Sequence, residues 1–152
     1  MTPSAAIATF IKSFEGCRNR SYQDISGKWT IGYGHTGSDV GPGDYWPQDK
    51  CELVFNQDLA EFGKLVAGLL VLSNTTQYEF DAIVSLAYNV GITAVMDSTL
   101  RKMHNSGNPY KTVYQFLEWD HAGHSELLGL LKRRAQEAII YSNGAYPYAN
   151  TN

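Results

Sequence analysis

The segment from residue 15 to residue 36, EGCRNRSYQDISGKWTIGYGHT, constrains the fold more than any other part of the chain. Before it, apolar residues recur at helical spacing: Ile7, Phe10, Ile11 and Phe14. Thr2 and Pro3 are suited to begin this helix, and Gly16 is suited to end it. A polar turn and an alternating strand then follow within the same segment. The sequence therefore predicts a helix over about residues 2–15 that leads directly into a small antiparallel sheet, which is an α+β arrangement.

Two carboxylates of this segment lie in contrasting environments. Glu15 falls in the last turn of the predicted helix, where the negative end of the helix dipole disfavours a charged carboxylate and should raise its pKa. Asp24 lies among the polar and glycine residues of an expected exposed turn, residues 23–27, where it should stay hydrated and ionised. A protonated and an ionised carboxyl group are what acid/base cleavage of a glycosidic bond requires. We therefore interpret Glu15 as the acid and Asp24 as its ionised partner.

The strand after this turn has few side chains on one face. Alternation over residues 29–35 leaves on that face only Thr30, Gly32 and Gly34. Because glycine has no side chain, a flat polymer can approach the backbone closely there, with the Thr30 hydroxyl available for hydrogen bonding. We expect Gly32 and Gly34 to contact the substrate.

The motifs F-E-G-x-R and Y-x-D-x-x-G-x-x-T-I-G-Y-G-H-T both occur between residues 14 and 36. They resemble the motifs of phage-type lysozymes (endolysins), glycoside hydrolase family 24, and residues 77–91, 98–100 and 129–137 extend the resemblance over most of the chain. The resemblance implies a lysozyme-like α+β fold. It also implies a catalytic set of Glu15, Asp24 and Thr30 that cleaves, with inversion, the β-1,4 bond between N-acetylmuramic acid and N-acetylglucosamine in bacterial peptidoglycan.

The rest of the chain is predicted to be helical. A capping-box-like pair, Asp49 and Glu52, opens a connecting helix over about residues 49–72, and Thr76 with Glu79 opens another that ends at Gly91. Three further helices are expected over about residues 98–107, 109–117 and 127–141.

A single domain over residues 1–152 follows from these elements. We expect a lobe with the sheet over about 16–50 and a helical lobe over about 73–145 that also takes in the helix over 2–15. The substrate groove should lie between the two lobes.

Two further residues are candidates for substrate binding. Asn89 near the end of the helix over 76–91 either lines the groove or caps that helix. In the last helix an apolar stripe marks the expected buried face: Leu128, Leu131, Ala135, Ala138 and Ile139. Arg133 and Arg134 should then lie elsewhere on the helix. Arg134 could hold a substrate carboxylate through a forked contact, and a surface salt bridge is an equal alternative.

Histidines and cysteines are expected to be structural. His35 at the strand end is interpreted as an ion-pair anchor in preference to a catalytic base. Cys17 and Cys51 are too few for a disulfide framework, and packed thiols are the favoured interpretation. Residues 118–124 contain two histidines and two carboxylates without the spacing of a zinc motif, so we expect neither a metal nor another cofactor.

Charge and hydropathy restrict the partners and the location. A net charge of −3 and a pI near 5.7 argue against nucleic-acid binding. No apolar run approaches the ~18 residues of a membrane span, and the first residues lack the basic start of a signal peptide. We expect a monomer made in the cytoplasm that acts on peptidoglycan in the periplasm or cell wall. Release would use a pore, another delivery route or a larger parent chain.

Three alternatives stay open from the sequence. A lytic transglycosylase would cut the same bond without water, although the pairing of Asp24 with Thr30 favours hydrolysis. A wall-binding module would have no activity, and an enzyme with a chitinase-like preference would favour a different polymer.

Overall fold

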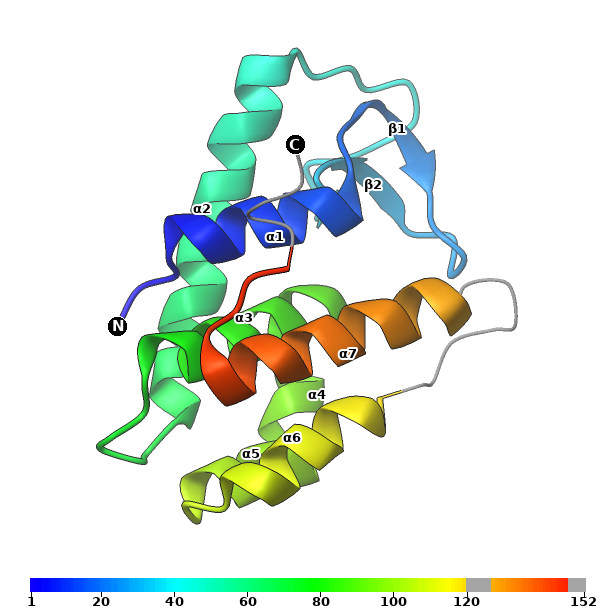
Figure 1. Ribbon diagram of the computed structural model, residues 1–152. Helices are drawn as coiled ribbons and strands as arrows, with labels where there is room; N and C mark the ends of the chain where they lie inside the picture. The colour runs from blue at the N-terminus through cyan, green and yellow to red at the C-terminus, as the bar shows by residue number, and fades with distance from the viewer. Residues whose placement is uncertain (120–126, 148–152) are drawn as a thin grey trace.

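Two lobes joined by a long helix make up the computed structural model, which describes residues 1–119 and 127–147 (Figure 1). The small lobe holds a three-stranded antiparallel sheet of β1 (Arg18–Gln23), β2 (Trp29–Gly32) and β3 (His35–Thr36), in that order. The connecting helix is α2 (Gln48–Leu69). The remaining helices are α1 (Ala5–Glu15), α3 (Gln77–Val90), α4 (Ile92–Met96), α5 (Thr99–Asn105), α6 (Pro109–Leu117) and α7 (Leu127–Asn143). The predicted α+β class is confirmed.

The first helix begins later than the sequence predicts. The N-cap of α1 is Ser4, whose hydroxyl accepts a hydrogen bond from the Ile7 amide at 3.1 Å. Thr2 is therefore not the cap, because Ser4 supplies the oxygen and is itself held by the buried carboxylate of Asp81. The predicted end is confirmed, since Gly16 follows Glu15 with φ 63° and its amide bonds to the Lys12 carbonyl.

The strand over residues 29–35 is shorter than its alternation predicts. β2 ends at Gly32 and β3 begins at His35, with Tyr33 and Gly34 in a turn between them. Gly32, the last residue of β2, and Gly34 in the turn have φ values of 66° and 84°, in the left-handed region that interrupts the extended alternation of a strand. The two glycines therefore turn the chain, and their expected common face does not exist.

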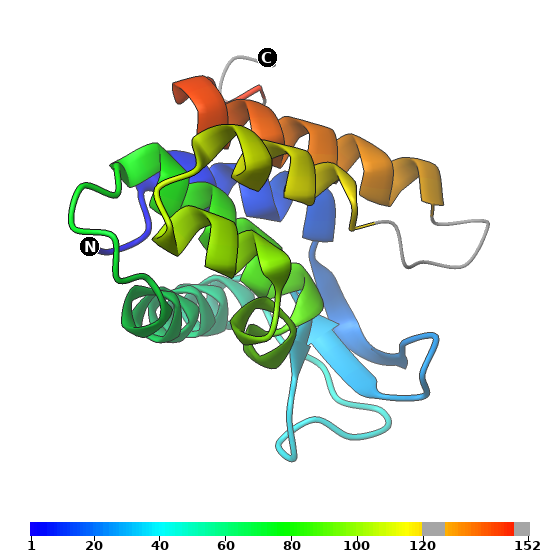
Figure 2. The same ribbon diagram turned by 90° about the horizontal axis from the view of Figure 1, so that it is seen from below.

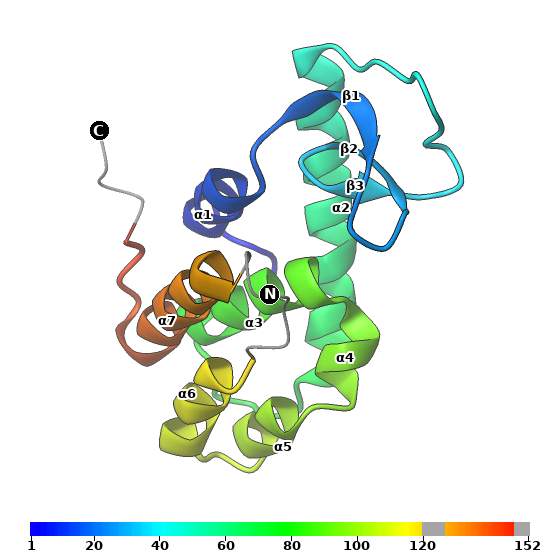
Figure 3. The ribbon, with the colours of Figure 1, turned by 90° about the vertical axis from the view of Figure 1, so that its right-hand side faces the viewer.

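The helix α2 joins the lobes and carries part of both cores. Cys51 at its start packs in the small-lobe cluster with Ile31, Val40 and Trp46, and Phe55 and Leu59 further along belong to the large core. Figure 3 shows the sheet beside the first half of α2, and Figure 2 shows α6 between α5 and α7, with α7 packed on α3. The expected capping box at residues 49 and 52 does not form, because the N-cap is Pro47 and no side chain of the described residues caps the helix. No helix in the described residues combines the length and the apolar character needed to cross a membrane.

The two cysteines are free thiols, as the sequence predicts. Cys51 is 1% exposed and Cys17 packs against the same cluster from the segment after α1. Burial, reinforced by the neighbouring Cys17 thiol, raises the pKa of Cys51 to about 11.

We expect the Cys51 thiol of the folded protein to react with iodoacetamide at pH 8 roughly 100-fold more slowly than an ordinary cysteine, because only the thiolate is nucleophilic. Alkylation followed over time by peptide mass spectrometry measures this rate, with the half-buried Cys17 as the internal comparison. Modification of both residues at equal rates would show that the burial of Cys51 does not protect it.

Candidate active site

One cavity of about 600 Å³ gathers most of the residues that the sequence singles out. It lies where the end of α1, the sheet, the middle of α2 and the end of α3 meet. Its predicted members are Glu15, Asp24, Thr30, Gly34 and Asn89. The other lining residues are Tyr22, Lys28, His35, Thr36, Asp58, Phe62, Tyr88, Val90 and Gly91. Both predicted carboxylates therefore border one space that could hold a ligand.

The Glu15 carboxylate is held from the helical lobe. Its Oε1 accepts a hydrogen bond from Arg133 Nη1 at 2.6 Å, and its side chain is 19% exposed. On the other side it lies against Gly34, since a Cβ added there would stand 3.1 Å from Glu15 Oε2. Arg133 thus fixes one oxygen of Glu15, and the other faces the glycine of the turn.

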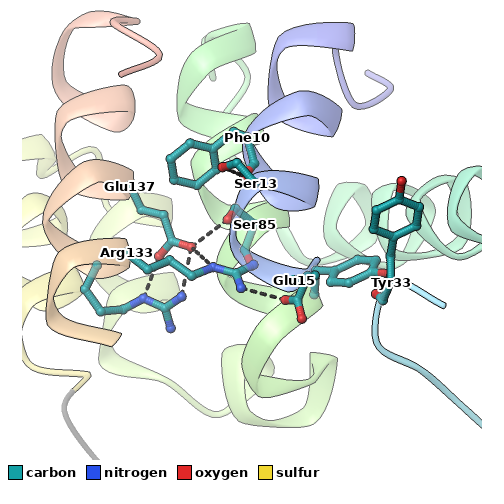
Figure 4. A network of polar contacts seen from close by, with 9 residues as sticks. Phe10, Ser13, Glu15, Tyr33, Ser85, Arg133 and Glu137 are labelled. Carbon is teal, nitrogen blue, oxygen red and sulfur yellow. Dashed lines mark hydrogen bonds and ion pairs between the residues drawn. The ribbon is translucent and has the colours of Figure 1, made fainter. Parts of the chain in front are cut away.

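A buried network supports Arg133 from behind. Glu137 is fully buried, and its Oε1 accepts from Ser85 Oγ at 2.6 Å, Arg134 Nη2 at 2.9 Å and Arg133 Nε at 3.3 Å. Figure 4 shows Arg133 reaching from Glu137 to Glu15, with Ser85 of α3 against Glu137. Arg133 also donates to the Ser85 carbonyl at 3.3 Å. The position of Glu15 therefore depends on contacts among α1, α3 and α7.

Gly34→Ala is expected to lower kcat about 10- to 100-fold, because its Cβ would displace the Glu15 carboxylate from its place against the turn. The matched control is Gly43→Ala, since Gly43 has a similar φ of 77° and nothing within 4 Å of an added Cβ. Both variants should lose about 1–2 kcal/mol of stability from the backbone conformation. Equal kinetic losses in the two variants would refute the role of the close approach.

Asp24 lies in the turn between β1 and β2, with its carboxylate oriented by hydrogen bonds. Oδ1 accepts from Ser26 Oγ at 2.7 Å, Lys28 N at 2.8 Å and Ser26 N at 2.9 Å. These bonds hold the pKa of Asp24 below its usual value, and the bond from the Ser26 hydroxyl has the largest effect. Oδ2 takes part in no recorded hydrogen bond within residues 1–119 and 127–147. Asp24 therefore offers one ionised oxygen to the cavity.

Thr30 lies on the strand that follows, with only 4% of its surface exposed. Its hydroxyl donates to the Lys28 carbonyl at 3.1 Å, so its proton is committed to the backbone. The oxygen lone pairs remain available to accept a hydrogen bond from the cavity.

Two other expected contacts do not face the cavity. A Cβ at Gly32 would meet the Trp46 ring at 3.4 Å and Cys51 Sγ at 3.7 Å, so this glycine faces the small-lobe core. Arg134 is 1% exposed and is paired with Glu137, which places it inside the helical lobe and away from the cavity lining. Asn89, in contrast, is exposed and lines the cavity.

His35 has the predicted role of an ion-pair anchor. Its Nδ1 lies 2.7 Å from Asp58 Oδ2 of α2, and its Nε2 lies 3.1 Å from both carboxylate oxygens of Asp39. Burial, the largest single influence, lowers the pKa of His35, but the hydrogen bonds and charges of Asp58 and Asp39 outweigh it and the pKa is raised. His35 therefore ties β3 to α2 most strongly when it is protonated.

We expect His35→Asn to cost about 1.5–3 kcal/mol near pH 5.5, where the charged hydrogen bonds are fully formed. Because the folded pKa is raised, this contribution is present below the unfolded pKa of about 6.5 and is lost as the pH rises through the folded pKa. Urea unfolding of wild type and variant at pH 5.5 and 8.5 measures it. An equal difference at both pH values would rule out the ion pair as its source.

Several residues of the site escape sequence reasoning. Arg133 is separated from Glu15 by 118 positions, so no local pattern connects them. Tyr88 of α3 lines the cavity, and its hydroxyl donates to the Tyr33 carbonyl at 2.7 Å, which joins the two lobes. Asp58 of α2 lines the cavity and holds His35. For Arg133, the one available signal is its place in the GLLKRRAQE segment that carries the family resemblance.

The described residues contain no group of three or more side chains arranged to hold a metal ion. Within the histidine-containing segment singled out from the sequence, residues 120–124 lie outside the described residues.

Comparison with known proteins supports the same family over most of the chain. The family model described as Phage lysozyme matches residues 12–137. An endolysin of Bacillus phage B103 is 42% identical over 146 residues, which cover 95% of this chain and 55% of that relative. The chain spans about half the length of the Bacillus phage relatives that it matches.

Solved structures agree with the fold. An endolysin from Escherichia coli O157:H7 phage FAHEc1 has a TM-score of 0.85 and 36% identity, with 97% of each chain covered. The muramidase domain of SpmX from Asticaccaulis excentricus has a TM-score of 0.82 and 31% identity, over 92% of this chain and 97% of that one. The expected lysozyme-like fold is thereby confirmed.

Proposed function

Because the chain belongs to the phage lysozyme family, we propose that it hydrolyses the β-1,4 bond between N-acetylmuramic acid and N-acetylglucosamine in bacterial peptidoglycan. The observation that carries this proposal is the shared cavity of about 600 Å³, bordered by Glu15 from the end of α1 and Asp24 from the β1–β2 turn. Most glycoside hydrolases use a pair of carboxyl groups, one on either side of the scissile bond, as their catalytic groups.

Glu15 serves as the general acid. Arg133 occupies Oε1, so the proton is delivered from Oε2, which faces the cavity beside Gly34. Proton transfer to the leaving oxygen makes that oxygen a better leaving group as the glycosidic bond breaks. The network behind Arg133 keeps the carboxyl group in one orientation during this step.

Asp24 and Thr30 together place the attacking water. The ionised Oδ2 of Asp24 accepts a hydrogen bond from the water and takes that proton as the new C–O bond forms, while the oxygen of Thr30 accepts a hydrogen bond from the other hydrogen. The water oxygen then directs a lone pair at the anomeric carbon, on the face opposite to the leaving group. Asp24 also stabilises the positive charge that develops on the sugar. This arrangement inverts the anomeric configuration.

The cavity wall accommodates the glycan. Gly34 allows the close approach of a sugar to the turn, and the exposed amide of Asn89 offers both a donor and an acceptor. Gly32 and Arg134 have no part in this proposal, because both face a lobe interior.

Turbidity loss of outer-membrane-stripped cells tests the activity, with Glu15→Gln and Asp24→Asn as inactive variants. Mass spectrometry of digested sacculi should find free reducing N-acetylmuramic acid ends. Anhydro-muramyl ends would instead identify a lytic transglycosylase. Binding to sacculi without any digestion by wild type would identify a wall-binding module, and faster cleavage of chitin oligomers than of sacculi would identify a chitinase-like enzyme.

The proposed activity places the protein at the bacterial cell wall. Peptidoglycan in the wall or periplasm is the proposed partner, and the chain acts as a monomer after release through a pore or another delivery route. Size-exclusion chromatography with light scattering measures the oligomeric state.

A further inference from the structure

Tyr22 projects from the sheet beside the two residues that are proposed to place the water. In the β1–β2 pairing Tyr22 lies directly opposite Thr30, and cross-strand partners point their side chains to the same face. Asp24 follows Tyr22 by two residues, and its amide pairs with the Lys28 carbonyl at 2.9 Å. These four residues all line the cavity: Tyr22, Asp24, Lys28 and Thr30. Tyr22 therefore stands in the same row as Asp24 and Thr30, on the cavity face of the sheet.

The ring of Tyr22 is held by a stacked cation, and within the described part of the chain its hydroxyl has no hydrogen-bond partner. The Arg18 guanidinium lies over the ring, with its central carbon 4.4 Å from the ring centroid. Within residues 1–119 and 127–147 no hydrogen bond of the Tyr22 hydroxyl is recorded. A half-buried aromatic ring with a fixed plane and an unused donor is suited to a polar ligand.

The surroundings keep this hydroxyl neutral. Burial raises the pKa of Tyr22, the charge of Arg18 opposes this, and the charges of Glu15 and Asp24 raise it further. The phenol and both carboxylates border the same cavity. The Tyr22 hydroxyl thus remains a donor throughout the neutral pH range.

We propose that Tyr22 is a substrate-positioning residue whose hydroxyl donates a hydrogen bond to an oxygen of the sugar bound between Glu15 and Asp24. Arg18 acts through it, by stacking on the ring and fixing the direction of the hydroxyl. This inference rests on the proposed function, since it takes the ligand to be a peptidoglycan glycan. It adds a sugar contact from the sheet to those already proposed for Gly34 and Asn89.

Tyr22→Phe tests the contact, because it removes only the hydroxyl. The matched control is Tyr45→Phe, since Tyr45 is 58% exposed and lies outside the cavity lining. Like Tyr22 it is stacked with an arginine, because the central guanidinium carbon of Arg20 lies 5.5 Å from the centroid of its ring. With soluble peptidoglycan oligosaccharides we expect kcat/KM to fall about tenfold in Tyr22→Phe, as for a lost neutral hydrogen bond, and to stay unchanged in the control. The unfolding temperatures of both variants should match wild type.

A double-mutant cycle tests the role of Arg18. Arg18→Met alone should lower kcat/KM severalfold, but in the Tyr22→Phe background it should add little, because no hydroxyl is left to orient. Arg20→Met provides the control at the second stack. Full additivity of Arg18→Met and Tyr22→Phe would overturn the positioning role of Arg18.

Binding separates this inference from the proposed hydrolysis. Calorimetry of the same oligosaccharides with Glu15→Gln, alone and combined with Tyr22→Phe or Tyr45→Phe, requires no turnover. The contact is supported if Tyr22→Phe, but not Tyr45→Phe, weakens binding or lowers kcat/KM. The binding result supports it even if the wild-type protein does not hydrolyse the oligosaccharides. Unchanged binding and unchanged kinetics in Tyr22→Phe would overturn it.

Discussion

Glu15→Gln is expected to lower kcat by about 10²–10⁴-fold, because glutamine cannot donate the proton that the leaving oxygen requires. The variant should remain folded, since the glutamine carbonyl can still accept the hydrogen bond that Arg133 donates to Oε1. Reducing ends released from purified sacculi give the rate, and circular dichroism reports the fold.

Glu61→Gln is the control for this substitution. Glu61 is exposed on α2 and lies outside the cavity lining, so the same chemical change there should leave kcat within a factor of two. A Glu15→Gln variant that keeps more than about a tenth of the wild-type rate would exclude Glu15 as the general acid.

The second large effect concerns stability. Glu137→Gln should reduce the free energy of unfolding by about 3–5 kcal/mol, because it removes the negative charge that compensates two buried arginines. For a chain of this size each kcal/mol lowers the unfolding temperature by about 2–4 °C. Urea unfolding gives the free energy, and Glu61→Gln, which should change it by less than about 0.5 kcal/mol, is again the control.

A double replacement distinguishes charge from packing. Arg134→Met combined with Glu137→Met should recover much of the stability lost in Glu137→Gln, since apolar residues of similar size can replace a buried ion pair at little cost. If Glu137→Gln alone costs less than about 1 kcal/mol, the network does not hold α7 in place and another explanation is needed for the position of Arg133.

Sequence reasoning places the elements well where local signals are strong. The capping box of Thr76 and Glu79 is confirmed by both of its hydrogen bonds, and Gly91 ends α3 as predicted. The stop at Gly16 is equally local, which is why Glu15 could be assigned to a helix end. These features depend on neighbours within a few residues, and such neighbours are visible in the sequence.

The last helix shows where the same reasoning is wrong. The periodicity predicts that its apolar stripe is buried, but of the five stripe residues only Ala138 is buried, whereas Leu128 is 81% exposed and Ile139 is 42% exposed. Besides Ala138, Ile140 and Tyr141, the buried side chains of α7 include Arg133, Arg134 and Glu137, whose charges compensate one another. Hydrophobic periodicity cannot recognise a face that is buried through paired charges, because the pairing depends on α3 and α1 as well.

In the candidate site, too, residues close together in the chain can be predicted from the sequence, and residues brought together by packing cannot. The carboxylates, Thr30 and Gly34 could be named from a short motif, because they lie close together in the chain. Arg133 could not be assigned, since its contact with Glu15 forms only when distant helices pack. The alternation pattern predicts the wrong face for Gly32, because its positive φ rotates it out of that alternation and the sequence does not reveal a φ value.

The configuration of the newly released reducing end tests the account most directly. Proton NMR during the first minutes of digestion of soluble peptidoglycan oligosaccharides distinguishes the two anomers before they interconvert. A water placed by Asp24 and Thr30 and a proton from Glu15 predict that the α-anomer forms first. First appearance of the β-anomer would mean that a covalent intermediate forms, and would contradict the role given to Asp24.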